Sequence, residues 1–325
     1  MRPRVSLDSY IEALDGAMRA SSDKRASHGA IQDSLRDFAT DPVVLKEILR
    51  RHIATPENMN SRHYPVLSIP IARTASIELV ANCWITLPDS GTNLSTKAIH
   101  HHGEMLLSTA TAFGPGYEHW MFRTPPYDAN RDDYDLELLD RRVHARGSVA
   151  FVDSRTAHVP FYPPSLTITI ALWTNSSPTT WRDHLKRRPA LRRNSESLRR
   201  LLRRVGLARA LDLKIVEYFD FTPTSAGFRI LKDRWEFPQG PNADYLASMF
   251  SILQATKNED LFSIARTHAK NPLVQDQALV MSLSDDLEAG RPIGARLSAG
   301  HTGAAHANFT AEMIEAALRS REVRS

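Results

Sequence analysis

One stretch of the chain reads Ala98-Ile99-His100-His101-His102-Gly103-Glu104-Met105-Leu106. The branched and apolar residues around the histidines predict a β-strand, which we place at residues 98–111. Successive side chains of a strand point to opposite faces, so His100, His102 and Glu104 share one face while His101 points away from it. Imidazole and carboxylate groups bind first-row divalent metals well. The stretch therefore predicts one part of a metal site.

A second stretch supplies a further histidine. Residues 146–160 read Arg-Gly-Ser-Val-Ala-Phe-Val-Asp-Ser-Arg-Thr-Ala-His-Val-Pro. Gly147 begins a turn, a short apolar strand follows, and after a second turn His158 enters the next strand. A single histidine on a strand is more often an ordinary polar residue than a ligand. The cluster at His100 and His102 changes that balance, and His158 becomes a candidate third ligand.

In these two stretches the sequence resembles the cupin superfamily. The first motif of that family supplies a His-x-His pair and usually a later glutamate, and its second motif supplies a last histidine after a glycine turn, a strand and another turn. His100-x-His102 matches the first motif, and Gly147 to His158 matches the second. The resemblance implies a double-stranded β-helix over residues 65–175. It also implies that His100, His102 and His158 hold a divalent metal, for which iron(II) is expected and other divalent ions stay open.

The sequence departs from the cupin pattern where the later glutamate would fall, at Leu106 or its neighbour. In one coordination scheme three histidines hold the metal, which resembles the thiol dioxygenases of the same superfamily. In the other, His102, Glu104 and His158 form a 2-His-1-carboxylate triad, which resembles the 2-oxoglutarate oxygenases. Glu104 favours the second scheme, although residues 165–173 carry no Arg or Lys that could hold 2-oxoglutarate. A site that uses all four ligands is a third alternative.

Short runs of branched and aromatic residues flank these stretches, and turn residues such as Gly114-Pro115-Gly116 separate them. Many short strands without intervening helices predict an antiparallel sandwich or barrel. The predicted strands cover residues 66–73, 77–87, 98–111, 118–123, 136–143, 148–153 and 165–173.

The strand after Gly116 has two distinct faces. Tyr117, His119 and Met121 lie on one face, and residues 118, 120 and 122 lie on the other. We expect one of these faces to line the substrate cavity, and we regard Tyr117 and His119 as candidate catalytic residues together with Glu104.

We divide the chain into a helical segment at 1–62, the barrel at 63–176 and a mainly helical part at 177–325, which makes an α+β fold. Apolar residues at helical spacing predict two or three helices over residues 6–52. Later helices are predicted in the arginine-rich stretch up to residue 211 and at 243–255, 259–269, 273–289 and 310–320, with a loop at 290–308. The C-terminal part is expected to cover the barrel or to form the interface of a homodimer.

Composition limits the function. The 325 residues are 42% hydrophobic and 24% charged, as in a globular protein. Cys83 is the single cysteine, which excludes an intrachain disulfide and a cysteine-based zinc cluster and favours a cytoplasmic setting. No segment approaches the roughly 20 apolar residues that span a bilayer, so no membrane association is expected. The net charge of +4 arises mostly between Arg182 and Lys214, where leucines at helical spacing favour an amphipathic helix over a nucleic-acid surface.

Taken together, these features predict a non-heme iron(II) oxygenase that acts on a small-molecule substrate and dioxygen inside the barrel. Two alternatives stay open. In the first, a lyase or isomerase uses the metal as a Lewis acid, and Glu104, Tyr117 or His119 moves a proton. In the second, a non-enzymatic sensor binds a small molecule in the barrel. Oxygen consumption would separate the oxygenase from the lyase or isomerase.

Overall fold

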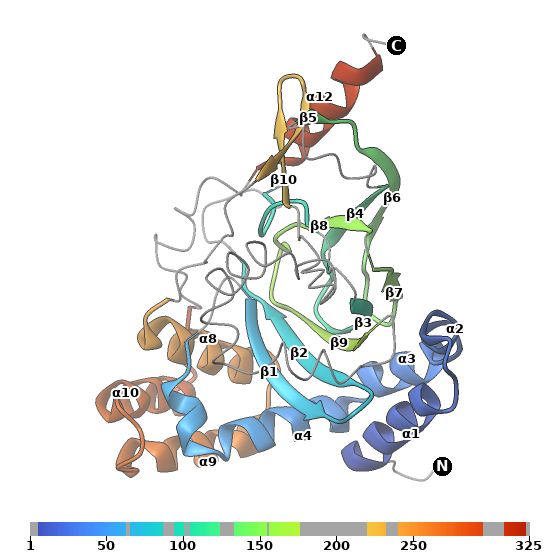
Figure 1. Cartoon of the computed structure of the whole chain (residues 1–325). Helices are drawn as coiled ribbons and strands as arrows, with labels where there is room; N and C mark the ends of the chain where they lie inside the picture. Colours follow the sequence, from blue (N-terminus) through green and yellow to red (C-terminus); the bar gives the residue numbers. More distant parts are fainter. Residues whose placement is uncertain are drawn as a thin grey trace, which may run out of the picture.

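The computed structural model describes residues 6–62, 66–86, 94–100, 102, 105–123, 133–154, 156–175, 220–231, 240–294 and 309–322. In Figure 1 a barrel of strands occupies the centre, and the helices of residues 7–53 and of residues 242–288 lie together beneath it. Glu104, the stretch from Arg182 to Lys214 and most of the predicted loop at 290–308 lie outside the described residues.

Two antiparallel sheets form the barrel (Figure 1). The first sheet contains β1 (Val66–Arg73), β2 (Glu78–Trp84), β3 (Met105–Phe113), β7 (Val149–Val152) and β9 (Thr167–Asn175). Its strand order is β1-β2-β9-β3-β7. The second sheet contains β4 (Glu118–Arg123), β6 (Glu137–Val143) and β8 (Ala157–Pro160) in the order β6-β4-β8. This arrangement is a cupin-type double-stranded β-helix, and with its flanking helices it confirms the predicted α+β class.

The chain changes sheets inside the stretch that we expected to be one strand at 98–111. Ile99 and His100 make isolated bridges to Phe221 and His158, whereas β3 begins at Met105. The expectation of a single strand was therefore wrong. One strand cannot hydrogen-bond along both sheets at once, so the chain leaves the second sheet after His100 and enters the first at Met105, where β3 pairs with β7 and β9.

A hairpin further along the chain belongs to a third sheet and meets the barrel at Ile99. It consists of β10 (Asp220–Thr224) and β11 (Gly227–Leu231), and β11 also pairs with the short β5 (Asp133–Tyr134). Ile99 N donates to Phe221 O at 3.1 Å, and Phe221 N donates to Ile99 O at 2.7 Å. The last helix, α12 (Ala311–Glu322), packs on this hairpin (Figure 1). The hairpin thus holds the segment that carries His100 against the barrel.

The described N-terminal residues form four α-helices where two or three were predicted. They are α1 (Leu7–Arg19), α2 (Lys24–Ala30), α3 (Gln32–Thr40) and α4 (Pro42–Ile53), followed by the 3-10 turn η1 (Pro56–Asn60). The side chains of Ser6, Asp23 and Asp41 accept backbone N–H groups and cap α1, α2 and α4. The cap at Asp23 restarts the helix after a short polar break, which accounts for the additional helix.

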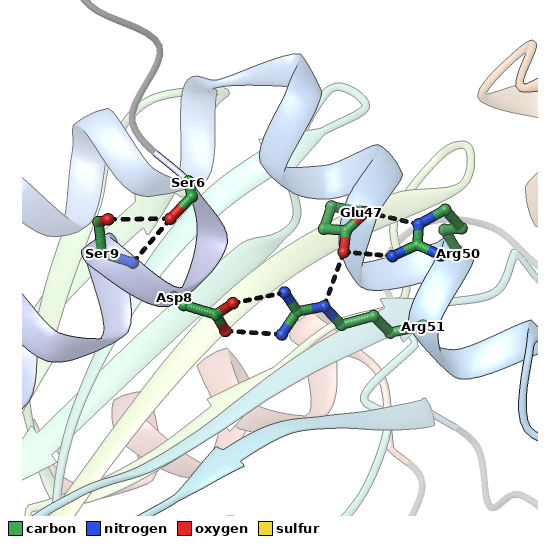
Figure 2. Close-up of polar contacts among 6 residues, drawn as sticks. All are labelled: Ser6, Asp8, Ser9, Glu47, Arg50 and Arg51. Atoms are coloured by element: carbon green, nitrogen blue, oxygen red, sulfur yellow. Dashed lines mark hydrogen bonds and ion pairs between the residues drawn. The ribbon is translucent and has the colours of Figure 1, made fainter.

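Ion pairs on the surface join the first and the last of these helices. Figure 2 shows Arg51 of α4 bound through two nitrogens to the Asp8 carboxylate of α1, at 2.7 and 2.8 Å. Glu47 accepts from Arg51 at 2.7 Å and from Arg50 at 2.6 Å. Asp8 and the two arginines are well exposed, so water screens these pairs, and they orient the helices more than they stabilise them.

Five helical segments between residues 242 and 288 pack against the N-terminal helices and the outer face of the first sheet. They are α8 (Asn242–Ala255), η2 (Glu259–Leu261), α9 (Phe262–Thr267), η3 (His268–Lys270) and α10 (Gln277–Glu288). Leu49 of α4, Leu79 of β2 and Phe250 of α8 are fully buried in one continuous core. Residues from both ends of the sequence therefore depend on each other for burial, while the division at residues 62 and 176 stays a prediction. Within the described residues no helix has the length and apolar character to cross a membrane.

Candidate metal centre

Three histidines meet inside the barrel. His100 and His158 are held by a reciprocal backbone pair, in which His100 N donates to His158 O at 3.0 Å and His158 N donates to His100 O at 2.7 Å. Nε2 of His102 lies 3.2 Å from Nε2 of His100 and 3.0 Å from Nε2 of His158. One ligand atom from each of the three residues falls within 4.8 Å of the other two. The structure thus brings together the three histidines that the sequence singled out.

The separations of these nitrogens suit a shared ion. Three nitrogens that each lie about 2.1 Å from one ion, at right angles to one another, would be about 3.0 Å apart. His100 Nδ1 lies 3.0 Å from the carbonyl oxygen of Ala98, which can only accept a hydrogen bond, so the ring proton is on Nδ1. The lone pair that can bind a metal is therefore on Nε2. Burial lowers the pKa of His100 and of His158 well below the usual value, and the charges of nearby Lys97 and His102 add to this effect at His100. Both rings are therefore neutral at pH 7, the form that binds metal.

A second pair of histidines lies behind His158. His119 Nε2 is 2.6 Å from His158 Nδ1, and His119 Nδ1 is 3.2 Å from His144 Nε2. His119 and His144 are 2% and 1% exposed, so water does not compete for these nitrogens. His119 comes from β4, and His144 directly follows β6, the neighbouring strand. The three rings form a continuous hydrogen-bonded chain that begins at the candidate ligand.

One part of the barrel interior next to the histidines is apolar. Leu107, Val152 and Ala171 form a small buried cluster against which Met121 and Trp173 pack. The Trp173 ring meets His102 edge-on, with the ring centres 4.4 Å apart. Because the His102 ring contacts Trp173, an ion bound by His102 would lie beside this apolar surface.

The candidate residues of β4, together with Tyr117 just before it, lie in different parts of the barrel. His119 and Met121 face the interior, whereas Trp120 and Phe122 are buried in the opposite core beneath the hairpin. Tyr117 lies further back: its ring is 6.1 Å from that of His119 and stacks on Trp84 at 4.5 Å. Burial raises the pKa of the Tyr117 phenol, so it stays protonated.

Glu104 lies outside the described residues. The choice between the three-histidine scheme and the 2-His-1-carboxylate scheme therefore stays open, and so does the role proposed for Glu104 in catalysis.

Sequence reasoning missed His144 and Lys97. Burial lowers the pKa of Lys97 to about 8, and the negative charge of Asp220 counteracts the shift. The Lys97 charge in turn lowers the pKa of His100, His119 and His158. The proximity of Lys97 to the His-x-His pair was an available signal. His144 gave none, because only the pairing of β4 with β6 brings it to His119.

The fold and the three imidazoles define a class: a cupin-type barrel with a histidine cluster that could hold a divalent metal ion. No protein-family model matches the chain. No curated protein matches it either.

Several solved structures are similar to this chain. The structure of KdgF from Halomonas sp. has 11% sequence identity and a TM-score of 0.25, and the match covers 34% of this chain and 79% of that one. An RmlC-like cupin protein from Desulfovibrio desulfuricans has 12% identity and a TM-score of 0.22, with 34% and 83% covered. The DMSP lyase DddQ from Ruegeria pomeroyi DSS-3 has 11% identity and a TM-score of 0.24 over 36% of this chain and half (50%) of that protein. The strand pairings themselves define the barrel.

Proposed function

We propose that this protein is a metal-dependent enzyme that acts on a small molecule inside the barrel. The observation that carries the proposal is that Nε2 of His102 lies 3.2 Å from Nε2 of His100 and 3.0 Å from Nε2 of His158, with ligand atoms of all three residues within 4.8 Å of one another. Two of these histidines are buried and neutral, which favours metal binding over protonation. Histidine ligands suit iron, copper, nickel and zinc, and we propose iron(II) first.

The residues around the cluster would shape the reaction. Three protein ligands leave coordination positions open, and a bound iron(II) would supply dioxygen activation there. The chain's own contribution is to hold His158 through His119, to exclude water with Met121 and Trp173, and to orient a substrate beside the His102 ring. We therefore propose oxygenation of a small-molecule substrate as the reaction class, with dioxygen as the second substrate.

One observation favours a second reaction class. Lys97 belongs to the segment that carries His100, and its charge acts on three histidines of the site. Partial burial brings its pKa to about 8, so protonated and neutral forms are both accessible near neutral pH. An amine of this kind can accept or donate a proton if it reaches the substrate, which is the requirement of a lyase or an isomerase.

A metal analysis tests the shared part of both proposals. Protein purified without a histidine tag is expected to carry one divalent ion per chain, or to take one up from added iron(II). His102→Ala should lose this ion, whereas His52→Gln should keep it, since His52 is buried near Tyr245 outside the barrel interior. A wild-type protein that binds no divalent ion would contradict the proposal.

Oxygen chemistry distinguishes the two reaction classes. Nitric oxide, a surrogate for dioxygen, should give a paramagnetic adduct with the iron(II)-loaded protein if a coordination position is open. An oxygen electrode should then record substrate-dependent consumption in a panel of small molecules, with and without 2-oxoglutarate. Turnover of a panel member without oxygen consumption would favour the lyase or isomerase and overturn the oxygenase.

A further inference from the structure

The chain of rings behind His158 has a rigid outer end. His144 N donates to Tyr117 O at 2.9 Å, and Thr111 Oγ1 donates to the carbonyl of His144 at 2.8 Å. Gly116 approaches this carbonyl so closely that a Cβ atom at position 116 would lie 1.9 Å from it. Gly116 also has a φ of +94°, which other residues rarely adopt. The backbone at His144 is thus confined from several sides.

The rings themselves are arranged for N–H···N hydrogen bonds. The planes of His158 and His119 are inclined at 85°, and those of His119 and His144 at 82°. Each ring therefore presents a nitrogen edge to its neighbour rather than a stacked face. Each imidazole has one donor and one acceptor nitrogen when neutral, so a chain of three rings has a direction.

Metal binding would set that direction. If His158 uses Nε2 as a ligand, its proton sits on Nδ1 and is donated to His119 Nε2. His119 must then carry its own proton on Nδ1 and donate it to His144 Nε2. Conversely, a His144 ring that carries its proton on Nδ1 offers Nε2 as the acceptor and favours this same set of tautomers before the metal arrives.

We propose that His144, acting through His119, is a positioning residue that holds His158 in the tautomer and ring orientation required for ligation through Nε2. This inference rests on the proposed metal centre. A ligating histidine commonly donates its other N–H to a carboxylate, a backbone carbonyl or water. Here the acceptor is a neutral ring, which accepts the N–H of the ligand less strongly than a carboxylate would. The ligand is then a weaker electron donor, so a bound ion keeps more of its positive charge.

Two variants at position 144 separate hydrogen bonding from packing. His144→Leu fills similar space without an acceptor, and His144→Gln can place its amide oxygen where Nε2 lies. We expect His144→Leu to weaken divalent-metal affinity about 10- to 100-fold, the usual effect of losing such an outer partner. His144→Gln should retain most of the affinity, and His52→Gln should be indistinguishable from wild type. Affinity is measured by chelator competition with cobalt(II) or zinc(II).

Long-range ¹H–¹⁵N NMR reads the tautomers directly. Zinc-loaded wild type should show protonated Nδ1 on both His158 and His119, and His144→Leu should show a mixed population at His119. A wild-type His119 protonated on Nε2 overturns the proposal, even if His144→Leu does not fold. Equal losses of affinity in the Leu and Gln variants, or no loss in the Leu variant, would also overturn it. A wild type that binds no metal defeats the proposed function instead, so the two failures are distinguishable.

Discussion

His100 and His158 lie side by side because their main chains exchange both hydrogen bonds, at 3.0 and 2.7 Å. In an antiparallel pair, residues directly opposite each other project from the same face, and the two imidazole centres are 4.2 Å apart. The main chain alone makes this pairing. Each side chain can therefore be removed without removing the strand contact that positions the other.

The first prediction concerns the ligands. His158→Ala should abolish stoichiometric metal binding while the barrel keeps its secondary structure, because the backbone bonds of residue 158 do not depend on its side chain. Elemental analysis and far-UV circular dichroism of the same sample check both halves. A His158→Ala protein with full metal occupancy would show that the cluster is not the site.

A ranking of variants decides between the two coordination schemes. In the three-histidine scheme, His100→Ala should lose metal about as completely as His102→Ala, and Glu104→Ala should retain it. In the 2-His-1-carboxylate scheme, Glu104→Ala should lose the metal and His100→Ala should keep much of it. Metal content measured under identical loading conditions gives the ranking, and the second result would strengthen the case for 2-oxoglutarate.

A third prediction concerns His28, which is buried between α2 and the first sheet. Its Nδ1 lies 2.7 Å from Ser108 Oγ and its Nε2 2.8 Å from Thr174 Oγ1. Burial lowers its pKa from 6.5 to about 4, while the nearby charges of Asp153 and Lys24 act in opposite directions. The unfolded chain therefore binds more protons than the folded one between these two values, and folding stability falls as the pH falls through this window.

The size of that loss follows from the shift. The lowering of the His28 pKa from 6.5 to about 4 corresponds to a loss of about 3 kcal/mol in the free energy of unfolding between pH 7 and pH 4. Urea unfolding at pH 7 and pH 5 should show a smaller pH dependence for His28→Gln than for wild type. Other buried histidines, such as His52, shift in the same direction, so the comparison with wild type is essential. An identical pH dependence in both proteins would contradict the assignment.

The fourth prediction compares two glycines. Gly116→Ala should destabilise the protein by more than about 1 kcal/mol, because φ is positive there and the new Cβ would collide with the His144 carbonyl. Gly16 lies within α1 with nothing near its absent Cβ. Gly16→Ala should therefore stabilise by about 0.5–1 kcal/mol. Thermal melts of the two variants should move in opposite directions, and a neutral Gly116→Ala would remove the argument for a confined His144.

The last prediction tests the shared core. Phe250 of α8 is fully buried among residues of the N-terminal helices and the first sheet. Phe250→Ala should cost about 3–5 kcal/mol of unfolding free energy. Leu273, 55% exposed, is the matched control, and Leu273→Ala should change stability by no more than about 0.5 kcal/mol. A loss at Phe250 no larger than that at Leu273 would contradict the burial of Phe250 in the shared core.

The sequence by itself determined the local elements and the three principal histidines. The predicted strands at 66–73 and 118–123 coincide with β1 and β4, and the predicted helix at 243–255 nearly coincides with α8. These elements are readable because side-chain periodicity and turn residues act over a few positions. His100, His102 and His158 were readable because their spacing matches a known pair of motifs.

The tertiary structure alone decided the contacts that depend on distant parts of the chain. The crossing between sheets after His100 depends on hydrogen bonds to β8 and β10, which no local pattern in 98–111 encodes. The same holds for His144, which reaches His119 through the pairing of β4 with β6, and for α8, which shares a core with α4. Periodicity states which face of an element is apolar but not which other element covers it, because that choice is made by packing over the whole chain.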